Sequence, residues 1–186
     1  MTWLNTLRAY IFVASLLGGV APLTAPAFAQ ESIHSNAPSE ARDLEPDDLE
    51  SLILLLLGTI EILSDYRAKG AIPIVFQVPQ HTIEEKVCDE PCNVTAAYIP
   101  REGIYLAANL DPVREPLDRS ALLHELVHYL QQGHSKFASM APCQRERAKE
   151  EEAYAIQNAY LQSIQSKARV VFYAGDFDCE SDGMER

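Results

Sequence analysis

Basic residues are scarce in this sequence. Its 186 residues include 15 lysine and arginine residues against 27 aspartate and glutamate residues, which gives a formal net charge of −12. Such an acidic surface repels phosphate backbones and anionic lipid headgroups. We therefore expect no nucleic-acid partner and no attachment to anionic membranes, although the charge carries no information about the fold.

The sequence also lacks an apolar run that would make a convincing membrane span. The apolar segment 10–21 is short, contains a pair of glycines and is followed at once by a proline. Arg8 precedes it, and the small-x-small sequence Ala27-Phe28-Ala29 follows it. This order is typical of a secretory signal peptide that is cleaved after Ala29. We expect a secreted or periplasmic protein with no stable membrane anchor.

Three regions follow from this interpretation. Residues 1–29 are the expected signal peptide, and residues 30–45 are polar and without periodicity, as in a flexible tether. Residues 46–186 are long enough for one compact domain.

Cysteines are few, but their number is even. All four (Cys88, Cys92, Cys143 and Cys179) lie after the expected cleavage site, and an exported chain favours disulfides. Three pairings are possible, and we prefer Cys88 with Cys92 and Cys143 with Cys179. A cysteine metal site is less well supported, because the Cys88-xxx-Cys92 pair has no matching second pair.

Hydrophobic periodicity predicts an α+β domain. We expect helices over 46–69, 116–132 and 143–167, strands over 72–78, 94–99 and 104–109, and a further short strand over 170–174. Residues 100–103 suit a hairpin turn between two of these strands. The predicted architecture is a small antiparallel sheet packed on an N-terminal core helix and two further helices.

The pattern His124-Glu125-Leu126-Val127-His128 lies within the second of these helices. Residues four apart lie one turn above each other on a helix, so His124 and His128 can present two imidazoles to one cation. Glu125 can then take a proton from a metal-bound water. Glu125 is the only charged residue between Ala121 and Leu130, so the helix is expected to be buried, where two histidines and a glutamate need partners.

A catalytic zinc usually takes three protein ligands, and the third must come from elsewhere. His134 lies six residues after His128, which is the wrong offset, whereas the next helix carries Glu150, Glu151 and Glu152. Glu150 shares the mostly uncharged helix face and is preferred, Glu152 stays open, and Glu151 points elsewhere. The alternative is that all three are solvated surface acids.

The HELVH motif followed by a helix with an inward-facing glutamate resembles the gluzincin zinc metallopeptidases. The chain is also similar to exported bacterial HExxH proteins of unassigned function that carry an EAYxxQ-type helix, here residues 152–157. The resemblance implies an edge strand beside the active-site helix, matched by order to Ile104–Asn109, where a peptide pairs with the backbone. This sequence departs from the family at Tyr154, which occupies a position where gluzincins often have an aspartate.

The resemblance implies zinc-dependent hydrolysis of peptide or protein substrates. Zinc would be bound by His124, His128 and Glu150, with Glu125 as the catalytic base and Tyr154, His134 or Tyr173 as further donors to the oxyanion. His34 and His81 are expected to be ordinary surface histidines. Two alternatives stay open: a secreted zinc-binding module or inactive peptidase homologue that acts by protein interaction, and a disulfide-linked interaction protein without metal.

Overall fold

The computed structural model describes residues 48–69, 72–88, 92–173, 177 and 179. The expected signal peptide and tether lie outside the described residues. The elements are α1 (Leu49–Leu63), β1 (Val75–Val78), α2 (Gln80–Val87), β2 (Ala96–Ile99), β3 (Gly103–Ala107), α3 (Pro116–Gln132) and α4 (Pro142–Ser163). The α+β class predicted from the sequence is confirmed.

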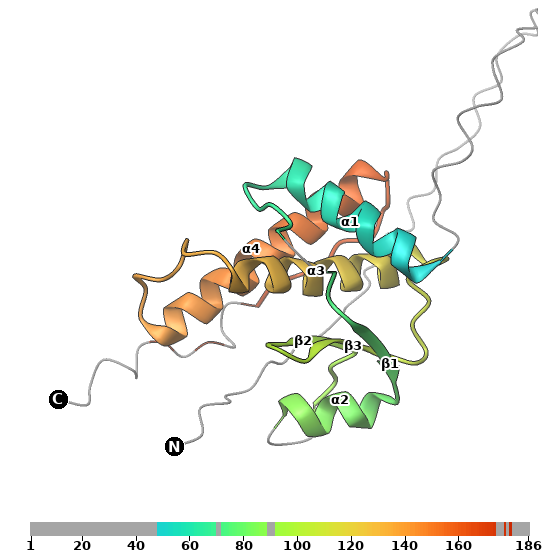
Figure 1. The fold of residues 1–186 in the computed structure, drawn as a ribbon, viewed down its shortest axis with the longest axis horizontal. Helices are drawn as coiled ribbons and strands as arrows, with labels where there is room; N and C mark the ends of the chain where they lie inside the picture. Colours follow the sequence, from blue (N-terminus) through green and yellow to red (C-terminus); the bar gives the residue numbers. More distant parts are fainter. Residues whose placement is uncertain (1–47, 70–71, 89–91, 174–176, 178, 180–186) are drawn as a thin grey trace, which may run out of the picture. The chain divides into compact units, whose positions relative to one another are not determined.

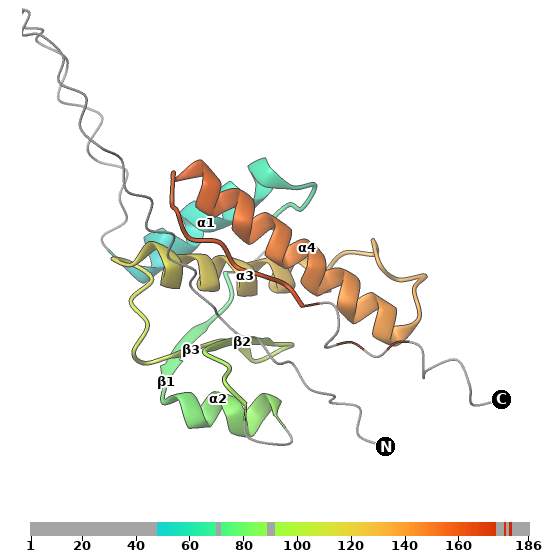
Figure 2. The same cartoon turned by 180° about the vertical axis from the view of Figure 1, so that it is seen from behind.

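Helix α3 is the central element of the fold. It runs between the sheet on one side and helices α1 and α4 on the other, and α2 covers the opposite face of the sheet (Figures 1 and 2). The main apolar core joins α1, α3 and α4 to the face of β3 that carries Ile104 and Leu106. A smaller core joins Ile83 of α2 to Tyr105 and Ala107 on the other face. Side chains that alternate along β3 therefore serve both cores.

The sheet is mixed, which corrects the prediction of an antiparallel sheet. Its strand order is β1-β3-β2, with β2 antiparallel to β3 and β1 parallel to β3. Parallel strands require a crossover connection, and here the crossover passes through α2 and β2. No helix was predicted at 80–87, because that segment is short and polar, and the crossover was therefore not expected.

Strand β3 is the central strand, so the expectation that Ile104–Asn109 forms a sheet edge is wrong. It pairs with β1 on one side and β2 on the other, and all five of its residues are buried. The strand at the edge next to α3 is β2 instead. Gly103, where β3 begins, has φ 143°, and a Cβ there would lie 2.4 Å from the carbonyl oxygen of Ile74. Only glycine fits this approach of β1 to β3.

Two of the three predicted helices end earlier than expected, whereas α3 has the predicted bounds. Helix α1 stops at Leu63, and the guanidinium of Arg67 reaches back to the carbonyl oxygens of Glu61, Ser64 and Tyr66. Helix α4 stops at Ser163, and Gln165 follows with a left-handed φ of 57°. In both cases, residues that the periodicity had assigned to the helix instead form the loop that ends it.

The predicted disulfide pairing is confirmed: Cys88 is bonded to Cys92, and Cys143 is bonded to Cys179. No strand forms over 170–173, the described part of the last predicted strand. The backbone of Val170 instead pairs with the side-chain amide of Asn158 on α4, with hydrogen bonds of 2.8 and 2.9 Å. Among the described helices, none is long and apolar enough to cross a membrane.

Candidate metal centre

Helix α3 presents His124 and His128 on the side that meets α4. The two Nε2 atoms lie 3.0 Å apart, as expected for residues one helical turn apart that turn toward the same point. His124 is buried and His128 is mostly buried. Both imidazoles are therefore held inside the protein, where a polar ring needs partners.

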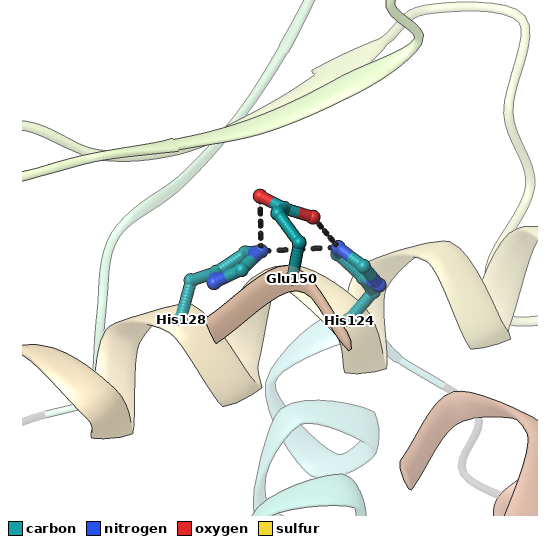
Figure 3. Close-up of side chains that lie close together, drawn as sticks. All are labelled: His124, His128 and Glu150. Atoms are coloured by element: carbon teal, nitrogen blue, oxygen red, sulfur yellow. Dashed lines mark hydrogen bonds and ion pairs between the residues drawn. The ribbon is translucent and has the colours of Figure 1, made fainter. Parts of the chain in front are cut away.

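Glu150 on α4 completes this group. One carboxylate oxygen lies 3.2 Å from Nε2 of His124, and the other lies 3.2 Å from Nε2 of His128. In Figure 3 the three side chains, from two helices, point toward one another. Their ligand atoms all lie within 4.8 Å of one another, so the cluster could hold a metal ion.

The other two acids of the run lie elsewhere, as helical phase requires. Glu151 is exposed to solvent. Glu152 accepts hydrogen bonds from the hydroxyl of Tyr66, from Nε2 of Gln131 and from the ammonium of Lys136. Glu150, preferred from its uncharged helix face, is thus the acid that the structure brings to the histidines.

The cluster is strongly coupled electrostatically. Burial lowers the pKa of His128, but the adjacent carboxylate of Glu150 outweighs this effect and raises that pKa to about 9. Burial raises the pKa of Glu150, yet the two histidines outweigh burial and hold it well below its usual range. The site therefore combines an ionised carboxylate with a histidine that readily takes a positive charge.

Glutamine side chains hold the outer nitrogens of both histidines. Nδ1 of His124 lies 3.1 Å from Oε1 of Gln157, and Nε2 of Gln157 donates to the hydroxyl of Ser120 at 3.0 Å. Nδ1 of His128 lies 2.8 Å from Oε1 of Gln131. Each imidazole is therefore oriented by an amide on the side opposite to the cluster.

Glu125 faces the sheet. Its Oε2 accepts a hydrogen bond of 2.7 Å from the backbone N–H of Tyr98 in the edge strand β2. Burial raises the pKa of Glu125 above its usual value, although His124 and His128 lower it. A buried carboxyl with a raised pKa beside two metal-ligand candidates is suited to accept and return a proton.

The remaining candidates from the sequence have different surroundings. The ring of Tyr154 packs edge-on against His124, with ring centroids 4.5 Å apart. His134 is exposed and packs against Tyr66 at 5.2 Å, outside the ligand cluster. Tyr173 and His81 are exposed, whereas His34 lies outside the described residues.

Sequence reasoning missed the supporting residues Gln131, Gln157, Ser120 and the amide of Tyr98. Gln131 lies three residues after His128, and Gln157 lies seven residues after Glu150, so both occupy the helix faces that carry the ligands. That spacing was a usable signal. The amide of Tyr98 carried none, because a backbone donor leaves no trace in residue type.

The chain belongs to the family described as a domain of unknown function (DUF6647), whose model matches residues 45–180. No curated protein and no solved structure matches the chain. The matched range contains both histidines, Glu125 and Glu150, so the whole cluster lies within the family's domain.

Proposed function

We propose that the protein is a zinc-dependent hydrolase of peptide bonds, with zinc bound by His124, His128 and Glu150. The observation that carries the proposal is the convergence of two imidazole nitrogens, 3.0 Å apart, on one carboxylate, each nitrogen lying 3.2 Å from a different oxygen of Glu150. Ligand atoms about 2.0–2.1 Å from a tetrahedral zinc lie about 3.3 Å apart, which matches these separations. Calcium and magnesium prefer oxygen ligands and fit this nitrogen-rich set poorly.

When bound there, zinc would supply a Lewis acid for the scissile carbonyl and would acidify a coordinated water. Glu125 would act as the base that takes a proton from the attacking water and returns it to the leaving amine. The Tyr98 amide holds one oxygen of Glu125 and leaves the other for this work. The Tyr154 ring packs against the ligand His124, which makes Tyr154 a better donor candidate than His134, whose ring packs against Tyr66.

The edge strand β2 is the element on which we expect a peptide substrate to lie. Thr95 accepts a backbone hydrogen bond from Ala107 of β3, whereas the N–H of Tyr98 points to Glu125. Backbone N–H and C=O groups alternate in direction along an antiparallel strand. Those of Ala96 and Tyr98 therefore point away from β3, to the side where the proposed base Glu125 lies. A peptide paired with this edge would place its carbonyls beside the metal cluster.

We also propose that the protein acts outside the cytosol, in a secreted or periplasmic location. Its two disulfides are of the kind that persists in oxidising compartments, and the sequence before the domain has the order of a signal peptide. Sequencing the N-terminus of exported protein would test this, with Gln30 expected as the first residue.

Substitution of Glu125 by glutamine tests the enzymatic part of the proposal. With fluorescein-labelled casein as the probe, turnover by the zinc-loaded protein should fall by about 10²–10⁴-fold in Glu125→Gln, while the zinc content stays near one per chain. The exposed Glu151→Gln is the matched control and should keep full activity. Undiminished turnover in Glu125→Gln would contradict the assigned role. Zinc binding without turnover in the unmodified protein would favour the zinc-binding module instead.

A further inference from the structure

The hydrogen bonds around each histidine fix which atoms donate and which accept. For His124 the assignment starts at Ser120, the residue farthest from the ring. The hydroxyl of Ser120 donates to the carbonyl oxygen of Leu117 at 2.7 Å. Its oxygen therefore accepts the hydrogen bond from Nε2 of Gln157. The amide of Gln157 is thereby oriented with Oε1 toward His124. An amide oxygen is only an acceptor, so Nδ1 of His124 must carry the proton.

The second network leads to the same result by a separate route. Nε2 of Gln131 donates to the carbonyl oxygen of Lys149 and to the carboxylate of Glu152, each at 3.0 Å. Both amide hydrogens of Gln131 are thus committed, and its Oε1 must face His128. Nδ1 of His128 is therefore also the donor, and its Nε2 points to Glu150.

We propose that Gln131 and Gln157 are positioning residues that hold His128 and His124 in the Nδ1–H tautomer, so that both present an Nε2 lone pair to the metal. This inference rests on the proposed function, because in the metal-free chain a carboxylate oxygen of Glu150 lies 3.2 Å from Nε2 of each histidine and attracts a proton there. With the metal bound, the Nδ1–H tautomer follows from the hydrogen bonds to the two amides.

The neutral charge of both amides has a consequence for the metal. A carboxylate partner would draw the Nδ1 proton more strongly and would make Nε2 a better ligand, whereas an amide does so less. Glu150 lies against both histidines, whereas Glu152 is directed to Tyr66, Gln131 and Lys136. Amide partners would therefore hold a zinc less tightly than carboxylate partners would.

Nitrogen NMR of the histidine side chains in the zinc-loaded protein tests the tautomer without any variant. The protonated nitrogen of His124 and of His128 should be Nδ1, although free histidine prefers the proton on Nε2. An Nε2–H tautomer at either residue would overturn the inference. That result would leave the zinc proposal standing, because zinc can also be bound through Nδ1.

Zinc affinity tests the role of the amides. Gln157→Met and Gln131→Met should each weaken zinc binding by about 10–100-fold. The exposed neighbours Gln162→Met and Gln132→Met, on the same helices, are matched controls and should change nothing. Gln157→Glu restores an acceptor to His124, and its zinc affinity should equal or exceed that of the unmodified protein, because Ser120 can turn its hydroxyl toward the new carboxylate.

Zinc affinities of Gln157→Met and Gln131→Met that match those of the controls would contradict the inference. Thermal unfolding of each variant shows whether it is folded under the binding conditions. If a methionine variant is unfolded, the comparison of Gln157→Glu with the unmodified protein decides: weaker zinc binding by a folded Gln157→Glu overturns the proposed effect of charge. Failure of the unmodified protein itself to bind zinc would refute the proposed function, whereas zinc binding with an Nε2–H tautomer would refute only this inference.

Discussion

Helices α1 and α3 both lie in the core, yet they bury opposite kinds of side chain. The buried residues of α1 are all aliphatic (Leu52, Ile53, Leu56, Leu57 and Ile60). Helix α3 buries five polar side chains besides its leucines and valine (Arg119, Ser120, His124, Glu125 and Gln131). Aliphatic burial stabilises the fold directly, whereas a buried polar group costs free energy unless it is hydrogen-bonded.

The polar side chains of α3 are matched by partners from other parts of the fold. Gln157 and Glu150 come from α4, and the Tyr98 amide comes from β2. In the part of the chain that the structure describes, Nε of Arg145 is the one buried side-chain nitrogen or oxygen without a hydrogen-bond partner. Helix α3 therefore uses its buried positions for the candidate metal centre and its supports, whereas α1 uses them for apolar packing.

The largest expected effect is a loss of stability when the apolar packing of α1 is disturbed. Leu56 on α1 is fully buried, so Leu56→Ala should lower the free energy of unfolding by about 2–5 kcal/mol. Zinc affinity of the folded protein should not change, because Leu56 is an apolar core residue of α1 and the proposed ligands lie on α3 and α4. Leu54→Ala, exposed on the same helix, is the control and should shift stability by less than about 0.5 kcal/mol. Urea unfolding and zinc titration measure the two quantities.

Removal of the third ligand should change zinc affinity. Glu150→Gln should weaken zinc binding by more than about a hundredfold, because losing a direct ligand costs more than losing a supporting residue. Glu151→Gln should have no effect. Glu152→Gln should have a smaller effect, transmitted through Gln131. A larger loss in Glu152→Gln than in Glu150→Gln, measured by titration at one pH, would refute the assigned ligand set.

The pH dependence of stability should differ between metal-free and metal-loaded protein. The pKa of His128 is raised from 6.5 to about 9 by Glu150, so its stabilising contribution is complete below pH 6.5 and is lost as the pH rises through about 9. Metal-free protein should therefore lose stability over this range in urea titrations. Zinc-loaded protein should not, since the metal replaces the proton. Equal pH profiles for both forms would contradict the coupling.

The smallest expected effect concerns the amide that holds Glu125. Tyr98→Pro removes the N–H and should lower kcat by about tenfold with little change in KM, because a base that is less firmly positioned transfers protons less well. Tyr98→Ala keeps the amide and is the control for the lost side chain. A fall in kcat of the same size in Tyr98→Ala would assign the effect to the ring instead.

Much of the site could be predicted because its signals are local. The bounds of α3 follow from a proline at its start and a glycine after its end, and Glu150 follows from the uncharged face that it shares with Ala153 and Leu161. These are properties of a single helix, and helical spacing alone determines which side chains share a face.

The features that could not be predicted depend on contacts between distant segments. The parallel pairing of β1 depends on the crossover through α2, a helix whose eight mostly polar residues give little periodicity. The position of β3 in the middle of the sheet depends on where β1 pairs. Gln131 and Gln157 were overlooked because an uncharged amide gains its role only from the histidine that it meets across the helix pair.

Metal analysis of the purified protein tests the central claim most directly. The domain should carry about one zinc per chain, and His124→Ala and His128→Ala should each lose it while remaining folded, since each removes one of three ligands from a site between α3 and α4. Stoichiometric zinc retained in both histidine variants, or none bound by the unmodified protein after incubation with zinc, would contradict the account.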